Sequence, residues 1–231
     1  MSHIESGFCI TDLNVLNNVI KNTCPELELV KSPTYRTWVT DYGRLAGDYP
    51  LPAMYQLILL NELRKKGVNI RELCAKAGYE LPENWVEMEK KPWSLEQQNK
   101  LKQTSPEFVE EYKRIEQQVI SKDSEYCIRY KPETNKCGYE IGLVKHPIRN
   151  EYVMMADWYN DGYGLFKAQG LGGVNQSNGK TEWGNTLKQN YAVTLVEEKV
   201  QQEIAQGNPA YGSYTKTTLA DGRIKLEVQS R

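Results

Sequence analysis

Hydrophobic residues in the middle of the chain recur at the spacing of a helix face. Met54, Leu57, Leu60 and Leu63 follow one another in steps of three, and Gly67 comes shortly after them. Side chains three or four positions apart lie on one side of a helix, and glycine often follows the last helical turn. We therefore expect a helix that ends at Gly67.

A second apolar stripe occupies residues 106–121. Phe108, Tyr112, Ile115 and Val119 are separated by steps of four, three and four among polar and charged residues. This pattern predicts an amphipathic helix.

Capping residues predict where several helices begin. Ser105 followed by Pro106 supplies an N-cap and a proline at the first helical position, and Ser94 with Gln97 has the spacing of a capping box. Two shorter helical segments are expected at 70–74, ended by Gly78, and at 82–88.

Both ends of the chain contain the short apolar runs of β-strands. The first part predicts strands at 3–10 and 27–38, the second broken near Pro33, with a helix over 12–22 between them. Further runs at 126–130, 139–144 and 152–158 are separated by short turns. Consecutive strands joined in this way form an antiparallel meander.

A β-hairpin is expected at the end of the chain. Asp221-Gly222 lies between two alternating runs over 211–219 and 223–228, and Asp-Gly in this position is a strong hairpin signal. Ile224, Leu226 and Val228 share one face of the second strand, so we expect that face to be buried.

Together these elements predict an α+β fold with a mainly antiparallel sheet and helices packed on one face. Without residues 54–123 the order is β-α-β followed by β-β-β-α-β-β, in which the last helix covers 184–206. We interpret 1–53 and 124–231 as an α+β core domain, and 54–123 as an inserted helical subdomain.

Composition narrows the classes of function. The formal net charge of −1 gives no general attraction to nucleic acid or to an anionic membrane. Five cysteines without a Cys-x-x-Cys pair indicate reduced thiols. The N-terminus lacks the pattern of a signal peptide, and no apolar run approaches the roughly 20 residues of a membrane helix. We expect a cytoplasmic protein in a reducing compartment, without membrane contact.

Six short strings of residues occur along the chain in a fixed order. They are Met1-Ser2-His3, Tyr126-Cys127-Ile128-Arg129, Tyr139-Glu140-Ile141-Gly142-Leu143-Val144, Ala156-Asp157-Trp158, Leu187-Lys188-Gln189-Asn190-Tyr191-Ala192 and Asp221-Gly222-Arg223-Ile224-Lys225-Leu226-Glu227-Val228. Their order resembles a family found in plastid genomes, cyanobacteria and large phages, the hypothetical chloroplast reading frame thirty-five family. The resemblance implies a fold rather than an activity, because the function of that family is not settled. Its phage members leave a phage origin open, and residues 54–123 depart from the family's pattern.

The string from Gly173 to Thr181 approaches a phosphate-binding loop. Such a loop needs four residues between its two glycines, so that backbone N–H groups surround the phosphates. Here five residues separate Gly173 from Gly179, and no apolar strand leads into the string. We expect a polar loop, with a nucleotide-binding enzyme as the second alternative.

A basic strip suggests nucleic-acid binding as the first alternative. The strip consists of Arg64, Lys65, Lys66, Arg71 and Lys76. The segment that should follow as a recognition helix in a helix-turn-helix instead holds Glu80, Glu83 and Glu87. Carboxylates there would be repelled by phosphates, which favours a plain helical hairpin.

No catalytic set or metal site is indicated. The chain has two histidines, His3 and His146, and no group of His and Cys has the spacing of metal ligands. We expect no cofactor.

The most site-like place is the end of the strand over 152–158. Asp157, Trp158 and Tyr159 precede a glycine-rich loop, and Gln189 and Tyr191 lie on the following helix. Polar and aromatic groups at a strand end can form the rim of a ligand site. We expect a non-enzymatic binding or accessory protein with a protein partner, and these five residues are its candidate binding residues.

Overall fold

The computed structural model describes residues 4–36, 50–84, 87–136, 138–156, 165, 185–219 and 224–230. The fold is α+β, as predicted. The chain forms two compact units. The first consists of Met1–Thr11, Leu29–Arg129 and Cys137–Gly162, and the second of Asp12–Glu28, Tyr130–Lys136 and Tyr163–Arg231.

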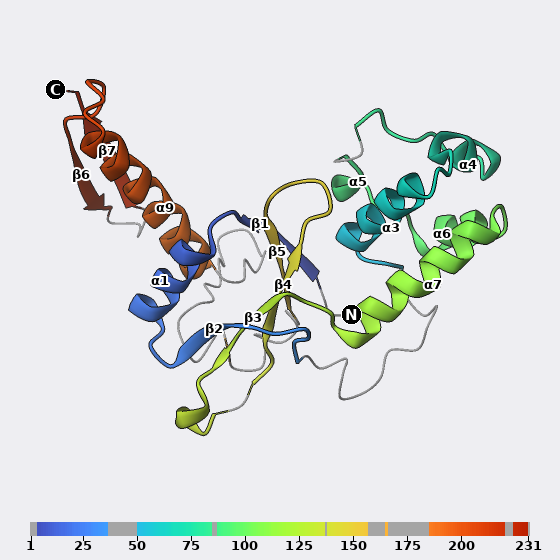
Figure 1. The fold of residues 1–231 in the computed structure, drawn as a ribbon, viewed down its shortest axis with the longest axis horizontal. Coiled ribbons are helices and arrows are strands. Elements are labelled where there is room, and N and C mark those ends of the chain that lie inside the picture. Colours follow the sequence, from blue (N-terminus) through green and yellow to red (C-terminus); the bar gives the residue numbers. More distant parts are fainter. Residues whose placement is uncertain are drawn as a thin grey trace. The chain divides into compact units, whose positions relative to one another are not determined.

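A five-stranded antiparallel sheet has the strand order β1-β5-β4-β3-β2 (Figure 1). Its strands are β1 (Ile4–Ile10), β2 (Leu27–Lys31), β3 (Tyr126–Tyr130), β4 (Ile141–Lys145) and β5 (Tyr152–Ala156). The pairs β3–β4 and β4–β5 confirm the predicted meander. The predicted strand over 27–38 ends earlier, at Lys31, and continues after Pro33 only as an isolated bridge between Thr34 and Asp123.

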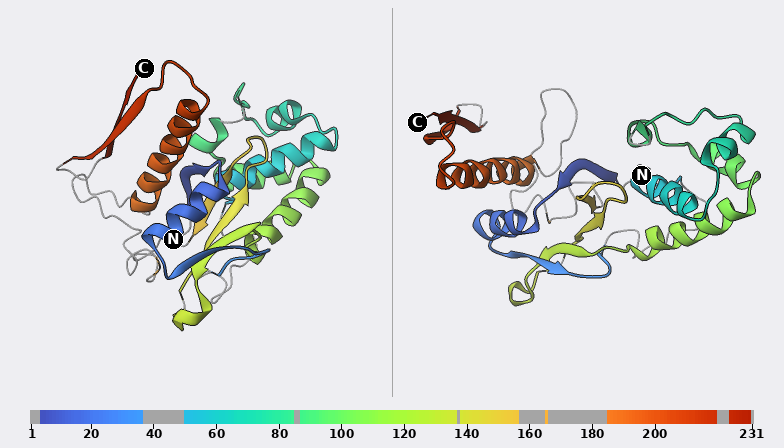
Figure 2. Two further views of the ribbon diagram at one scale, coloured as in Figure 1. Left: turned by 60° about the vertical axis from the view of Figure 1, so that its left-hand side comes forward. Right: turned by 45° about the horizontal axis from the view of Figure 1, so that its top comes forward.

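The first unit contains the helices of the middle of the chain (Figure 2). They are α3 (Ala53–Lys65), α4 (Ile70–Lys76), α5 (Glu87–Lys90), α6 (Leu95–Lys102) and α7 (Pro106–Ser121). The capping box at Ser94 is confirmed, and Ser105 caps α7 as expected. The helical turn expected at 82–88 is displaced toward the C-terminus and becomes α5.

Helices α3 and α7 pack on one face of the sheet. Side chains from both helices, such as Leu57 and Ile115, belong to one hydrophobic cluster with Cys127, Val153 and Met155. These last three residues lie on the same face, because strand partners across an antiparallel pair share a face. The helical segment and the strands of the first unit therefore share one core.

The sheet has a close contact at Gly142. The ring of Tyr35 lies over this glycine, and a Cβ atom at residue 142 would be 2.5 Å from Tyr35 Cε1. Tyr35 is 6% exposed, and burial raises the pKa of its phenol well above the ordinary value. Only glycine leaves room for this ring.

The second unit contains α1 (Leu13–Thr23), the short 3-10 helix η1 (Pro132–Thr134), α9 (Asn185–Ala205), and a separate two-stranded sheet of β6 (Ser213–Thr218) and β7 (Ile224–Gln229). Helices α1 and α9 pack against each other. The side chain of Asp12 caps α1, and its backbone N–H donates to the hydroxyl of Tyr191 on α9 at 2.9 Å. The hairpin is confirmed, and its turn lies outside the described residues.

The predicted burial of the hairpin's apolar face is wrong. Ile224 and Leu226 are half-buried, and Val228 is 41% exposed. The strands alternate as expected, but the elements described around them do not complete a core on that face.

The division of the chain into a domain of 1–53 and 124–231 and an insertion of 54–123 stays a prediction. Among the described residues, no helix is both long enough and apolar enough to cross a membrane.

Candidate functional site

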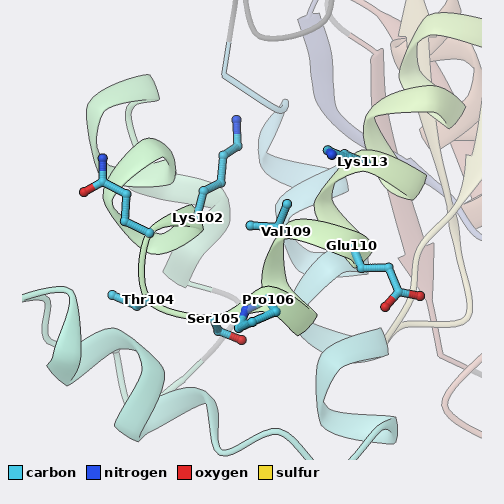
Figure 3. Close-up of a pocket in the computed structure, with 8 residues that line it drawn as sticks. Lys102, Thr104, Ser105, Pro106, Val109, Glu110 and Lys113 are labelled. Atoms are coloured by element: carbon cyan, nitrogen blue, oxygen red, sulfur yellow. The ribbon is translucent and has the colours of Figure 1, made fainter.

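Two adjoining pockets lie at the N-terminus of α7 (Figure 3). Their volumes are about 600 Å³ and 420 Å³, and both are lined by Thr104, Ser105 and Pro106. The larger pocket is completed by Lys102, Gln103, Val109, Glu110 and Lys113, and the smaller by Lys66, Gly67, Val68, Asn69, Glu72, Leu73, Lys76 and Glu107. We call this surface the α7 pocket.

A short, well-capped turn forms the ridge between the two pockets. Thr104 Oγ1 donates to the carbonyl of Leu101 at 2.7 Å, which holds the chain after α6. Ser105 Oγ accepts from the backbone N–H of Phe108 and donates to Glu107 Oε2. Proline at the first helical position fixes its own φ angle. These contacts and the proline ring restrain the backbone of the ridge.

Lys102 brings a positive charge to the larger pocket. Its Nζ lies 3.7 Å from the centroid of the Tyr112 ring, where the negative face of the ring attracts a cation. Partial burial lowers the pKa of Lys102, although the Glu116 carboxylate acts in the opposite direction. Figure 3 shows Lys102, Val109 and Lys113 along this pocket, and Glu110, which follows Val109 on α7, with its carboxylate extending away from them.

The smaller pocket contains part of the basic strip that the sequence suggested. Lys66 Nζ lies 2.7 Å from Glu111 Oε2, and Lys76 Nζ lies 2.7 Å from Glu72 Oε1. Lys65, at the end of α3, pairs with Glu62 at 2.6 Å. Lys65, Lys66 and Lys76 therefore each have a carboxylate partner. Arg64 and Arg71 are exposed.

Glu111 connects α7 to the turn after α3. Its side chain is 1% exposed and forms ion pairs with Lys66 and Arg114. Burial alone would raise the pKa of Glu111, but its two basic partners outweigh burial and hold the pKa below the ordinary value. The hydrogen bond that Lys66 donates to Glu111 raises the pKa of Lys66. Both groups are therefore ionised at neutral pH.

A third pocket, of about 400 Å³, lies beside His146 and is lined among others by Tyr55, Asn61 and Asp123. His146 is buried, and its Nδ1 accepts from the backbone N–H groups of Ile148 and Arg149 at 3.1 and 2.9 Å. This nitrogen thus holds the β4–β5 turn. Within the described part of the chain, no group of three or more His, Cys, Asp or Glu side chains is arranged for a metal ion.

The described thiols with shifted pKa values are poor nucleophiles. Burial raises the pKa of Cys9 to about 12 and of Cys74 to about 11, and it also raises that of Cys24. A thiol reacts as its thiolate, so these groups are largely unreactive at neutral pH. Cys127 is buried and in no disulfide, and Cys137 lies outside the described residues.

Most of the binding residues suggested by the sequence cannot be placed in a site. Asp157, Trp158 and Tyr159 lie outside the described residues, as does the loop from Gly173 to Thr181. Gln189 is half-buried on α9. Tyr191 is buried, and its hydroxyl accepts a hydrogen bond at the start of α1.

The α7 pocket was not predicted from the sequence. Ser105 and Pro106 mark the start of α7, but no local signal places the turn between α3 and α4 beside it. That position depends on contacts such as Lys66–Glu111, which join residues far apart in sequence.

Comparison with known proteins gives no match to this chain, whether with protein-family models, with curated proteins or with solved structures.

Proposed function

We propose that this chain is a non-enzymatic binding protein that contacts a protein partner through the α7 pocket. The observation that supports the proposal is the mixed character of the two adjoining pockets. Lys102, Lys113 and Glu110 place both signs of charge around the apolar side chains of Val109 and Pro106. A protein surface or peptide whose apolar groups are flanked by positive and negative side chains complements such a lining.

The rigid ridge favours binding. Ser105 and Pro106 are fixed by the cap and the proline ring, so little backbone entropy is lost there when a partner side chain enters on either side. Preorganisation of this kind raises affinity by reducing the cost of ordering.

The charges of the basic strip favour a protein partner over nucleic acid. Nucleic acid binds where protein cations can neutralise its phosphates, and each such contact makes binding more sensitive to salt. Lys65, Lys66 and Lys76 already have carboxylate partners. A nucleic acid would compete with these carboxylates for the cations.

Affinity capture with charge-swapped variants tests the proposal. Tagged protein is incubated with a nuclease-treated lysate of the cells that make it, and captured proteins are identified by mass spectrometry. The test variant is Glu110→Lys with Lys113→Glu, two exposed positions on α7. The control is Glu198→Lys with Lys199→Glu, two exposed positions on α9.

The wild type and the α9 control should capture the same protein, and the α7 variant should lose it. Circular dichroism and thermal melting must show that all three chains are equally folded. A protein that all three chains capture equally would contradict a role of the α7 pocket. Capture that depends on intact nucleic acid in an untreated lysate would favour the nucleic-acid alternative.

We also keep as a proposal the relationship to the plastid, cyanobacterial and phage family. The order of the strings in 1–53 and 124–231 supports it. A phage origin is part of that proposal.

A further inference from the structure

The β6–β7 hairpin offers open strand edges. It is a separate two-stranded sheet, so within the described part of the chain each strand has one strand neighbour. Helix α9 runs beside it (Figure 2). Gln201 Nε2 donates to the hydroxyl of Tyr214 at 2.9 Å, and Lys216 Nζ pairs with Glu197 at 2.9 Å. Backbone groups on the outer edge of a strand are a template for another strand.

The face of the hairpin that meets α9 is only partly covered. Tyr214 pairs with Val228 across the two strands, so both lie on the face that contacts α9. Leu226 is half-buried on the same face, while Val228 is 41% exposed. On the helix, Val196 is 47% exposed. Two-stranded hairpins are at best marginally stable alone, and further apolar cover would stabilise this one.

The sequence of β7 is complementary to itself when it is reversed. From 224 to 228 it reads Ile-Lys-Leu-Glu-Val. Two copies aligned antiparallel about Leu226 place Ile224 opposite Val228 and Lys225 opposite Glu227. Opposite charges and apolar pairs directly across an antiparallel pair are stabilising.

Only one register gives this match. A shift of two residues in one direction places Lys225 opposite a second Lys225, and a shift in the other direction places Glu227 opposite a second Glu227. Like charges directly opposite are destabilising. A shift of one residue places apolar side chains opposite charged ones and exchanges the two faces of the strand.

The salt bridge within β7 does not prevent β7 from pairing with a second copy. Lys225 Nζ pairs with Glu227 Oε1 of the same strand at 2.7 Å, and both side chains are about half exposed, at 53% and 54%. They lie on the face opposite to Leu226, because neighbours along a strand alternate. Each can turn toward the second copy without losing burial.

We propose that two copies of the chain associate through β7, in an antiparallel pair centred on Leu226. The product is a four-stranded sheet in the order β6-β7-β7-β6, with the α9 helix of each copy on the same face. Val228 of one copy then packs against Ile224 of the other. The contact is isologous, as in most symmetric dimers.

Charge variants of the full-length chain test the register, with mass measured by sedimentation or light scattering over a range of concentrations. The wild type should dimerise. Lys225→Glu alone or Glu227→Lys alone should weaken the dimer about tenfold or more, since each change makes both symmetric charge pairs repulsive. The double variant Lys225→Glu with Glu227→Lys should recover the dimer, because it restores opposite charges.

A mixture of the two single variants gives the most stringent test of the register. The Lys225→Glu chain has a carboxylate at both positions, and the Glu227→Lys chain has an ammonium group at both. Every charge pair across a mixed dimer is then attractive, so a mixed dimer should form although neither variant dimerises well alone. A monomeric wild type at about 100 μM, which corresponds to a binding free energy weaker than about −5.5 kcal/mol, would overturn the proposal. A wild-type dimer that none of these substitutions weakens would also overturn it, because the contact would then lie elsewhere on the chain. So would a mixture of the two single variants that forms no mixed dimer.

Discussion

The contact between Tyr35 and Gly142 gives the most direct test of the packing of the sheet. Gly142→Ala would place a methyl group 2.5 Å from Cε1 and 2.6 Å from Cγ of the Tyr35 ring. Carbon atoms in contact lie about 3.5–4.0 Å apart, so the ring or the strand must move by more than about 1 Å. Tyr35 is 6% exposed and belongs to the hydrophobic cluster shared by the helices and the sheet.

The expected loss of stability follows from overpacking. Extra methyl groups in packed cores cost about 1–3 kcal/mol, and a clash with a buried ring belongs at the upper end of that range. For a chain of this size each kcal/mol lowers the melting temperature by about 2–4 °C. Gly142→Ala should therefore lower it by roughly 4–12 °C, measured by circular dichroism or calorimetry.

A double-mutant cycle separates the clash from other effects. Tyr35→Leu removes the ring, so in that background Gly142→Ala should cost less than about 1 kcal/mol. Gly207→Ala is the control, because Gly207 has a φ angle of 77° and a Cβ atom there would have no neighbour within 4 Å. Its cost of about 1–2 kcal/mol comes from the left-handed backbone and should not depend on Tyr35. Equal costs of Gly142→Ala with and without the Tyr35 ring would refute the reasoning.

Three further predictions follow from the first unit. Glu111 has a folded pKa below its ordinary value of 4.5, so its ion pairs stabilise the fold above that pH and this stabilisation is lost as the pH falls toward the folded pKa. Glu111→Gln should lower the unfolding free energy at pH 7 by about 1–3 kcal/mol in urea denaturation, and the difference between the two chains should shrink as the pH falls below 4.5 through the folded pKa; a difference independent of pH would contradict this. Deleting 54–123 should abolish cooperative unfolding, because it removes α3 and α7 from the core that they share with the sheet, whereas a sharp melt would support a separable insertion. Cys9 and Cys74, with pKa values of about 12 and 11, should be alkylated at least about tenfold more slowly at pH 8 in the folded chain than in urea; mass spectrometry of the labelled peptides measures this, and equal rates would show that the thiols are accessible.

Local signals in the sequence predicted the elements well, because caps and periodicity act over a few residues. Ser94, Ser105 and Gly67 each act within one helical turn, and the structure uses all three as expected. The antiparallel meander was equally predictable, since strands joined by short turns pair with each other. The misplaced turn at 82–88 shows the opposite case, where no capping residue marked the start of α5.

Contacts between residues distant in sequence decide which apolar faces are covered and which charges are paired, and local signals do not reveal these contacts. The stripe of Ile224, Leu226 and Val228 predicted an alternating strand correctly, but alternation cannot say whether anything covers the apolar face. The basic strip looked positive along the sequence, yet the carboxylate that neutralises Lys66 comes from Glu111, in a different helix. A linear count of charges therefore could not show that Lys66 has a carboxylate partner. The same distant pairing joins the turn after α3 to α7, and Lys66 in that turn lines the smaller of the two pockets.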